Sequence, residues 1–347
     1  MHALAGLADD APTRELRQTC IEVLCAYLRL PYTAEADLPQ GDADARHTYL
    51  ALREVRHTVI RLIRDHLRFP AQHPHSWQGH DLDFTGVVFV GGDFSQAVFT
   101  GGTVDFSQAV FTGGRVDFSQ AVFTDGTVDF RGASFSGGTV DFSQAAFSGA
   151  SFPGGTVDFR GASFSGSTVD FGNATFSGGT VDFHNAAFPG GSVSFLGAAF
   201  SGGRVDFGSA TFSGSMVDFG NATFSGGGVD FLSAAFSGGT VGFSRAMFSG
   251  GSVRFIDAAF SGGTVDFSNA WFPSGTVDFR AATFSSGTVD FNRASFSRGT
   301  VDFRNSTFSG GTVDFIFATG IALSDLVPAN GQPLPTGLRL PTAWTTP

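Results

Sequence analysis

The sequence contains no lysine: all 20 of its basic side chains are arginine. A phosphate-binding loop of the Walker type needs a lysine, so that class of nucleotide site is excluded. Cysteine is also scarce, because 347 residues hold only 2, which cannot form a disulfide framework. Cys20 and Cys25 are five residues apart within one predicted helix and point to different sides of it. We therefore expect both thiols to be reduced and unpaired.

Long apolar runs are absent as well. None approaches the length of roughly 18 residues that a membrane-spanning helix needs. The start of the chain carries Asp9 and Asp10 and lacks the basic region of a secretory signal. The formal net charge of −11 argues against a nucleic-acid-binding protein, which would show a basic patch or stripe. A cytoplasmic location is expected by default.

Glycine and phenylalanine are the residues in excess, with 48 and 42 copies respectively. Such a bias is typical of internal repeats. The chain divides into three zones on this basis. Residues 1–78 are charged and helical in pattern, residues 79–316 are repeats, and residues 317–347 form a tail rich in proline and leucine.

The first zone predicts a hairpin of two helices. Leu16, Cys20, Val23 and Tyr27 recur at helical spacing and indicate the apolar face of the first helix, which Pro31 closes. We expect this hairpin to cap the exposed end of the repeat zone.

The second helix is predicted from near Asp44 to Phe69, before Pro70. Its apolar side is expected to consist of Leu52, Val55, Val59, Leu62 and Ile63. A basic face within roughly 80° lies on the opposite side. This face is either a solvated surface or a contact for an acidic partner or an anionic lipid surface, and it comprises Arg53, His57, Arg61, Arg64 and Arg68.

In the second zone a twelve-residue unit recurs. Residues 103–114 read T-V-D-F-S-Q-A-V-F-T-G-G, and close copies follow onward to Thr312. The phenylalanines are five and then seven residues apart. Of the 42 phenylalanines, 40 lie on one continuous series of five- and seven-residue steps, and only Phe69 and Phe317 do not. A spacing this strict indicates a structural constraint.

Alternation within each short run predicts a β-solenoid. Val104 and Phe106 point to one side of a strand and Asp105 points to the other. Glycine in the links permits the positive φ that corners require. Strands of about three residues become stable only when each coil pairs with the coils above and below it.

The outward position of the V-D-F run is a candidate interaction surface. It is aspartate in most units and Ser194, Gly242 or Arg254 in three. The simpler interpretation is that these aspartates only keep the rod soluble and block edge pairing. The candidate residues are Asp105, Asp117, Asp129, Asp141, Asp158, Asp170, Asp182, Asp206, Asp218, Asp230, Asp266, Asp278, Asp290, Asp302 and Asp314.

Two coil sizes fit the period, a two-sided coil made of one twelve-residue unit and a four-sided coil made of two. The opening favours four sides, because Phe84, Phe89, Phe94 and Phe99 are all five residues apart. Four sides give close to ten coils and a rod about 46 Å long at ~4.8 Å per coil. An extra pentapeptide at 147–152 is expected to add one side and shift the aspartate columns by one face.

The runs D-F-S-Q-A-V-F and D-F-R-G-A-S-F resemble the pentapeptide-repeat family over about two-thirds of the chain. That family places a small residue two positions before a central Phe or Leu, and it implies a right-handed quadrilateral β-solenoid. This chain departs from it by two extra residues in every second repeat. The segment R-Q-T-C-I-E-V-L-C-A-Y-L-R-L-P-Y is similar to one that precedes the repeats in actinobacterial members. Many of those carry a membrane span further upstream, and none is expected here.

The resemblance implies two functions. The first is a non-catalytic scaffold or interaction rod with an unidentified protein partner. The alternative is a mimic of B-form DNA that binds DNA gyrase, as some family members do. The repeat zone holds 20 Asp, no Glu and 10 Arg, a net charge of −10. This is one net charge per ~4.6 Å, against one per ~1.7 Å in duplex DNA, so the mimicry is dilute. The proline-rich tail also disfavours the C-terminal helix through which known mimics dimerise.

Enzymatic activity is not expected, because the repeats offer no catalytic nucleophile, general base or metal-ligand cluster in a pocket. Only His184 lies within the repeat units, and we predict no cofactor and no metal. His73, His75 and His80 in the linker are weak ligand candidates. The tail is the second candidate cap, through Leu323, Leu326, Leu338 and Leu340.

Overall fold

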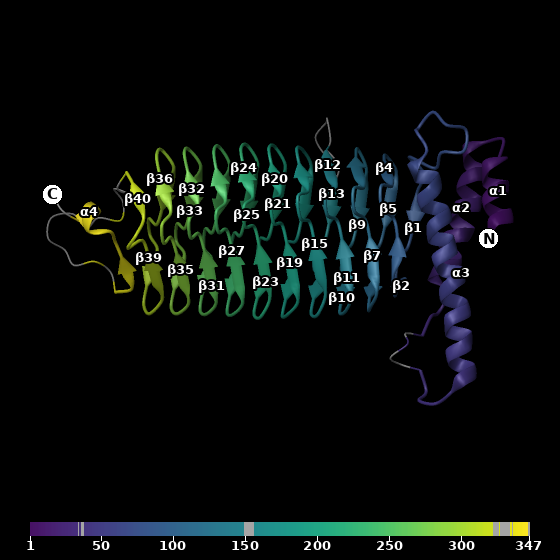
Figure 1. The fold of residues 1–347 in the computed structure, drawn as a ribbon, viewed down its shortest axis with the longest axis horizontal. Helices are drawn as coiled ribbons and strands as arrows, with labels where there is room; N and C mark the ends of the chain where they lie inside the picture. Colours follow the sequence, from purple (N-terminus) through teal and green to yellow (C-terminus); the bar gives the residue numbers. More distant parts are fainter. Residues whose placement is uncertain are drawn as a thin grey trace.

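The computed structural model describes residues 1–33, 35, 38–148, 156–321, 326, 334 and 336–345. Helices lie at one end of a rod of stacked strands, and the C-terminal segment lies at the other end (Figure 1). The N-terminal helices are α1 (His2–Asp9), α2 (Arg14–Arg29) and α3 (Ala43–Arg68). A short helix near the C-terminus is α4 (Thr342–Thr345).

Each coil of the rod contributes one strand to each of four parallel sheets, here called A to D in chain order. Sheet A consists of β1 (Leu82–Asp83), β5 (Thr103–Asp105), β9 (Thr127–Asp129), β13 (Thr156–Asp158), β17 (Thr180–Asp182), β21 (Arg204–Asp206), β25 (Gly228–Asp230), β29 (Ser252–Arg254), β33 (Thr276–Asp278) and β37 (Thr300–Asp302). Sheet B consists of β2 (Val88–Phe89), β6 (Val110–Phe111), β10 (Ser134–Phe135), β14 (Ser163–Phe164), β18 (Ala187–Phe188), β22 (Thr211–Phe212), β26 (Ala235–Phe236), β30 (Ala259–Phe260), β34 (Thr283–Phe284) and β38 (Thr307–Phe308).

The other two sheets complete the coil. Sheet C consists of β3 (Gly92–Asp93), β7 (Arg115–Asp117), β11 (Thr139–Asp141), β15 (Thr168–Asp170), β19 (Ser192–Ser194), β23 (Met216–Asp218), β27 (Thr240–Gly242), β31 (Thr264–Asp266), β35 (Thr288–Asp290), β39 (Thr312–Asp314) and β41 (Leu338–Arg339). Sheet D consists of β4 (Val98–Thr100), β8 (Val122–Thr124), β12 (Ala146–Ser148), β16 (Thr175–Phe176), β20 (Ala199–Phe200), β24 (Thr223–Phe224), β28 (Met247–Phe248), β32 (Trp271–Phe272), β36 (Ser295–Phe296) and β40 (Thr319–Gly320).

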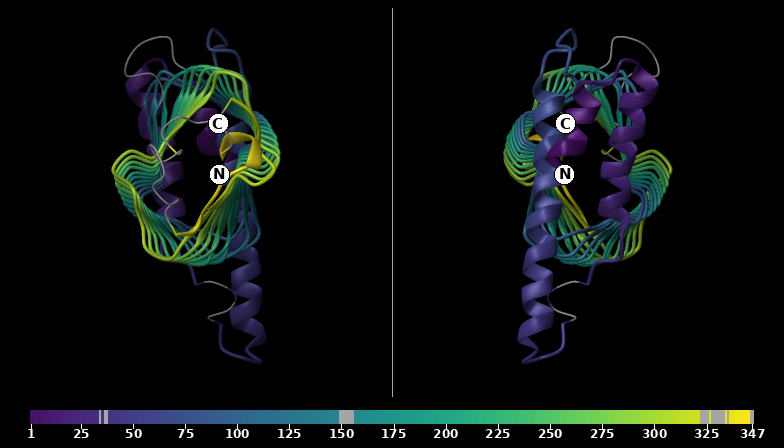
Figure 2. Two further views of the ribbon diagram at one scale, coloured as in Figure 1. Left: turned by 90° about the vertical axis from the view of Figure 1, so that its left-hand side faces the viewer. Right: turned by 90° about the vertical axis from the view of Figure 1, so that its right-hand side faces the viewer.

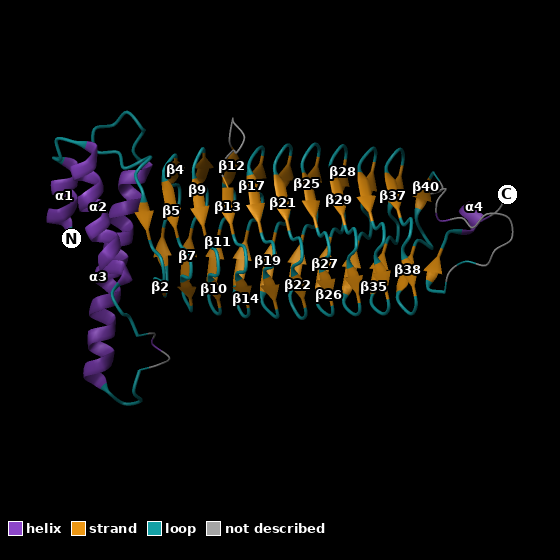
Figure 3. Cartoon of the chain, turned by 180° about the vertical axis from the view of Figure 1, so that it is seen from behind, coloured by secondary structure: helices purple, strands orange, loops and turns teal. Residues whose placement is uncertain are grey.

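The four-sided coil, made of two twelve-residue units, is confirmed. Thr103 pairs with Thr127 in sheet A, two units later in the sequence, and sheets B, C and D each occupy a further side. Seen from behind, the strands repeat coil by coil along the rod (Figure 3). The right-handed sense of the coil stays a prediction. Because the order around the coil is A, B, C, D, sheets A and C lie on opposite sides.

The core consists of the phenylalanine rings. Rings in one column stack nearly parallel, as Phe219 and Phe243 do at 4.8 Å between centroids and 4° between planes. Rings of sheets A and C meet edge to face across the interior, as Phe207 and Phe219 do at 6.2 Å and 89°. Both are favourable aromatic geometries, each contributing about 0.5–1.5 kcal/mol beyond the area buried. The inward Val and Ala of each unit fill the space beside the rings.

The prediction that the extra pentapeptide shifts the aspartate columns is wrong. Asp158 pairs with Asp129 on one side and with Asp182 on the other, all in sheet A. The step from Asp129 to Asp158 is therefore one pentapeptide longer than the step from Asp105 to Asp129, and the additional residues fall between β12 and β13. Keeping the columns in register preserves the stacked rings and the ladder hydrogen bonds of every later coil. Phe152 itself lies outside the described residues.

The two-residue links are tight turns with a left-handed residue that the sequence did not single out. Gln108 has φ of 57° and Ala281 has φ of 58°. The turn is closed by a backbone hydrogen bond, from the N–H of Ala109 to the carbonyl of Phe106 at 3.0 Å. A left-handed conformation costs a non-glycine residue roughly 1–2 kcal/mol, so these links are strained in every coil that lacks glycine there.

At the N-terminal end, α2 and α3 lie across the open coil (Figure 2). The sequence predicted two helices here, and α1 is a third element that it missed. The predicted apolar face of α2 is wrong at Leu16 and Val23, which are each 51% exposed, whereas Cys20 and Tyr27 are partly buried against the core. A second stripe at the same spacing is buried instead. It consists of Ile21, Leu24, Cys25 and Leu28.

The buried side of α3 also differs from the prediction. Val59 and Ile63 are buried, as predicted. Leu52 is exposed, however, and Arg56 and Ile60 are buried in addition. The Arg56 guanidinium donates to the carbonyls of Leu28 at 2.7 Å and Val88 at 2.9 Å. One charged side chain thus joins α2, α3 and the first coil, a role that a hydrophobic pattern cannot reveal.

The C-terminal tail covers the last coil. Leu338 in β41 pairs with Val313, which extends sheet C by one strand. Leu326 and Leu338 are buried, as predicted, and Leu340 is partly buried. Leu323 lies outside the described residues. The sequence missed Trp344, whose ring centroid lies 5.7 Å from that of Phe315.

Ala281→Gly is expected to raise the free energy of unfolding by about 1 kcal/mol, because glycine adopts a left-handed φ without strain. Ala282→Gly is the control, since the neighbouring Ala282 is buried in the core. This second variant is expected to destabilise. Denaturant unfolding of both variants checks the sign of each change.

Phe219→Ala is expected to lower the free energy of unfolding by about 3–5 kcal/mol, because a fully buried ring leaves a cavity between two stacked neighbours. Phe317→Ala is the matched control. Phe317 is 63% exposed, so its loss should change stability by less than about 0.5 kcal/mol. Equal losses in the two variants would contradict the stacked core.

Candidate functional site

The predicted interaction surface is two columns of aspartates on opposite sides of the rod. Sheet A carries Asp105, Asp129, Asp158, Asp182, Asp206, Asp230, Asp278 and Asp302. Sheet C carries Asp117, Asp141, Asp170, Asp218, Asp266, Asp290 and Asp314. No single flat face therefore presents all of them.

Each of these aspartates also holds a corner of the coil. The Oδ1 of Asp105 accepts a hydrogen bond from the backbone N–H of Ser107 at 2.7 Å, and Asp290 does the same with Asn292 at 2.7 Å. This turn motif recurs at every predicted aspartate. Aspartate is favoured at turns for this reason. Aspartate at this position thus has a structural cause that is independent of any interaction made by the surface.

The aspartates point away from the core, but several are not open to water. Five of them are buried, with 3–7% of the residue exposed: Asp129, Asp141, Asp158, Asp230 and Asp278. The sequence pattern gives the direction of a side chain but not how far its neighbours cover it.

Arginines neutralise most of sheet A. Arg131 pairs with Asp129 at 2.5 Å, and Arg280 pairs with Asp278 at 2.6 Å. Of the predicted sheet A aspartates, Asp105 alone lacks an arginine within 4.0 Å among the described residues. Among the described residues, five of these pairs join residues two apart in sequence and five join successive coils.

Sheet C is different. Asp117 and Asp141 share Arg115, and Asp314 lies 3.6 Å from Arg339. The middle of the column has no such partner within the described part of the chain. These unpaired carboxylates, here called the acidic column, are Asp170, Asp218, Asp266 and Asp290.

The pKa values differ between Asp290 of the acidic column and Asp302 of sheet A, although Asp182 of sheet A also has a pKa raised by burial and by repulsion from Asp206 and Asp158. The pKa of Asp290 is raised by burial, and repulsion from Asp266 and Asp314 raises it further. The pKa of Asp302 in sheet A is lowered, chiefly by its hydrogen bond with Arg304. Stacking like charges one coil apart, roughly 4.8 Å, is therefore unfavourable at Asp290 and at Asp182, whereas the arginine beside Asp302 offsets it.

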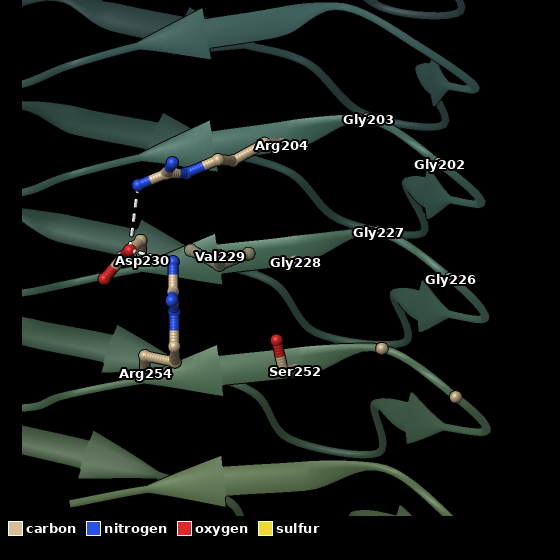
Figure 4. A pocket seen from close by; sticks show the side chains of 12 residues that line it. Gly202, Gly203, Arg204, Gly226, Gly227, Gly228, Val229, Asp230, Ser252 and Arg254 are labelled. Carbon is tan, nitrogen blue, oxygen red and sulfur yellow. Dashed lines mark hydrogen bonds and ion pairs between the residues drawn. The ribbon is translucent and has the colours of Figure 1, made fainter.

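A hollow of about 350 Å³ on sheet A shows how arginine and glycine combine there. Asp230 lies between Arg204 and Arg254, which reach it from the coils on either side (Figure 4). Gly228 stands where the neighbouring coils carry Arg204 and Ser252, and its missing side chain opens the hollow. Since Asp230 is already engaged by two guanidinium groups, its role here is to hold three coils together.

Residues 159–211 match the family model described as pentapeptide repeats, in 9 copies. The same coil, with the same Phe columns and the same four sheets, extends from β1 to β40 on both sides of that match. The chain is a pentapeptide-repeat protein. None of the curated proteins matches it. Members of this family are generally not enzymes.

In this pentapeptide-repeat protein the predicted basic face of α3 divides into two parts. Arg64 forms an ion pair with Asp93 of β3, and Arg68 donates to the carbonyl of Ser95 at 2.6 Å. These two arginines attach the helix to the first coil. Arg53 and Arg61 instead line a cleft together with His57.

The linker histidines take part in packing. His73 stacks on Phe69 with centroids 4.2 Å apart and meets His75 edge to face at 5.4 Å. His80 Nδ1 lies 3.0 Å from the Oε1 of Gln18. No group of three or more His, Cys, Asp or Glu side chains suited to a metal ion occurs among the described residues.

Both cysteines are unpaired in the protein. Burial raises the pKa of Cys25 to about 12, so its thiol stays protonated and behaves as a small apolar side chain. Within the described ranges, none of the helices is long and apolar enough to cross a membrane.

Asp290→Asn is expected to raise the melting temperature at pH 7 and Asp302→Asn to lower it, because each changes the free energy of unfolding by about 0.2–1 kcal/mol. Asparagine keeps the oxygen that accepts the turn hydrogen bond, so only the charge changes. The raised pKa of Asp290 means that its contribution to stability is present at low pH and lost as pH rises through that value.

The lowered pKa of Asp302 has the opposite effect, since its contribution is present at neutral pH and lost as pH falls through that value. Thermal melts of both variants between pH 2 and pH 7, at roughly constant ionic strength, therefore separate the two cases. If both variants lowered the melting temperature by the same amount at pH 7, the proposed difference between Asp290 and Asp302 would be refuted.

Proposed function

We propose that this protein is a non-catalytic interaction scaffold that docks a basic protein surface along the acidic column of sheet C. A rod of similar coils supplies a rigid, extended surface, as repeat proteins generally do. The main support for this proposal is that arginines pair with most aspartates of sheet A but not with those of the acidic column. Only unpaired carboxylates are available to a partner at little cost, because a paired one must first lose its arginine.

The acidic column has the dimensions of a docking site. Asp170 and Asp290 are five coils apart, which is roughly 24 Å at ~4.8 Å per coil. Ser194 and Gly242 occupy the intervening outward positions on sheet C. Small residues there leave room for long cationic side chains to reach Asp218 from above and below. Electrostatic complementarity of this kind favours fast and salt-sensitive association.

DNA mimicry directed at DNA gyrase is the second candidate. The acidic column favours it, because a row of carboxylates spaced along a rod can take the place of phosphates. Arginine pairing on sheet A weighs against it, since duplex DNA is charged on all sides. The scaffold proposal therefore stands first, and the same variants test both.

The test compares two quadruple variants in which only charge is removed. The sheet C variant carries Asp170→Asn, Asp218→Asn, Asp266→Asn and Asp290→Asn. The matched sheet A variant carries Asp158→Asn, Asp206→Asn, Asp278→Asn and Asp302→Asn. Binding of an oligoarginine peptide is measured for both and for the unchanged protein at low and high salt.

The sheet C variant is expected to bind at least about tenfold more weakly, at roughly 0.3–0.5 kcal/mol for each exposed charge pair, and the sheet A variant to bind almost as the unchanged protein does. Equal losses in both variants would overturn the proposed docking face. A gyrase supercoiling assay with the same proteins decides the second candidate. Inhibition that disappears only in the sheet C variant would establish mimicry, and no inhibition at micromolar concentration would remove it.

A further inference from the structure

A cleft of about 390 Å³ lies between α3 and the corners that join sheets B and C in the first two coils. The N-terminal part of α3 projects past the outline of the rod beside these corners (Figure 2). The ring of His57 lies close over the corner, since a Cβ added to Gly91 would be 3.6 Å from it. The cleft is lined by Arg53, His57, Arg61, Val90, Gly91, Gly92, Asp93, Gly114, Arg115 and Asp117.

Both acidic residues of this cleft have an arginine partner, although each of these arginines also pairs with a second aspartate. Asp93 pairs with Arg64, and Asp117 lies 3.2 Å from Arg115. Two other arginines of α3, Arg53 and Arg61, have no carboxylate partner of this kind among the described residues. Arg61 donates to the uncharged hydroxyl of Thr58 at 3.0 Å. Arg53 has no ion-pair partner within the described part of the chain. Two guanidinium charges therefore face the cleft without a counter-ion, in a chain whose net charge is −11.

Buried polar atoms at the same place lack partners. Within the described residues, Arg53 Nε and His57 Nε2 are buried without a hydrogen bond, and so is Thr112 Oγ1 on the adjoining corner. Thr112 lines a second hollow of about 420 Å³, which shares Arg53, Val90 and Gly114 with the first. Glu35 also lines this second hollow, where it lies 3.8 Å from Arg46. A buried polar atom without a partner costs about 1–3 kcal/mol, so a ligand that accepts hydrogen bonds here would recover that cost.

We propose that this cleft binds a phosphate group of a small free molecule, held by the guanidinium groups of Arg53 and Arg61 and by Nε2 of His57. The planar donors of arginine match phosphate oxygens, and two of them balance the two charges of a phosphate group. The volume of the cleft suits a compact anion. The glycines of the two corners, Gly91 and Gly114, place no side chains in the way.

The charges around His57 give the site a direct readout. Burial lowers the pKa of His57, and the positive charges of Arg53, Arg61 and Arg56 lower it further, against Glu54. A bound anion reverses this effect because it stabilises the imidazolium form. The charged groups that face the ring are Arg53, Glu54, Arg56 and Arg61 on α3, together with Asp93, Arg115 and Asp117 on the solenoid.

The experiment uses the full chain with inorganic pyrophosphate as the probe. Calorimetry measures binding, and NMR of the imidazole protons measures the pKa of His57 with and without the probe. The expected results are saturable binding and an upward shift of the His57 pKa. The double variant Arg53→Gln and Arg61→Gln should weaken binding at least tenfold and abolish the shift. The matched control is Arg245→Gln, an exposed arginine of the solenoid, which should change neither.

Thermal melting shows whether the double variant is folded. If it is not, the single variant Arg61→Gln, at an exposed position, takes its place with a smaller expected loss. Absence of pyrophosphate binding, or binding that survives the loss of these arginines, would overturn the proposal. A further arm uses vesicles that contain phosphatidic acid. Retention on vesicles without any binding of free pyrophosphate would also overturn it, since the source would then be a lipid headgroup.

Discussion

The stacking of phenylalanine rings in register along four columns is the interaction on which the whole structure depends. Successive rings lie flat on each other at about the spacing of parallel strands, as Phe111 and Phe135 do at 4.7 Å and 1°. The strands are only two or three residues long, and none could persist alone. Ring stacking and the backbone hydrogen bonds between strands depend on the same register. A coil that moved its rings out of register would therefore lose both interactions. This explains why the rod absorbs the longer step from Asp129 to Asp158 without shifting a column.

The same dependence makes the ends of the rod critical. A terminal coil exposes one layer of rings and one row of unpaired backbone groups, which terminal caps normally cover in repeat proteins. At the N-terminal end, α2 and α3 cover the layer, and Arg56 binds carbonyl groups from both sides of the junction. At the C-terminal end, β41 supplies the missing ladder and Trp344 covers the rings.

The surface charge of the rod depends on the residues at the corners of each coil and not on the core. Every predicted outward aspartate accepts a turn hydrogen bond, which favours aspartate at this position, although Ser194, Gly242 and Arg254 occupy it without disturbing the register of the coil. What varies is the residue two positions after the aspartate in sequence, or the residue that faces the aspartate from the next coil. Arginine there neutralises sheet A at Asp129 and Asp278, whereas small residues leave the acidic column unpaired. A uniform scaffold thereby acquires two unlike faces without any change in its core.

The sequence by itself determined the solenoid and its inward rings, because a step of five and seven residues that carries 40 of the 42 phenylalanines admits few other structures. It favoured four sides over two through the even spacing of Phe84, Phe89, Phe94 and Phe99, and the pairing of the strands decided between them. It also located the two capping zones. It could not identify which stripe of α2 is buried, since Leu16, Val23 and the true stripe through Ile21 and Leu24 have the same helical spacing. Nor could it separate Arg64 and Arg68, which attach α3 to the first coil, from Arg53 and Arg61, which line the cleft. Pairing between charges on successive coils, and contacts between a helix and a distant corner, are set by the three-dimensional coil and leave no local pattern in the chain.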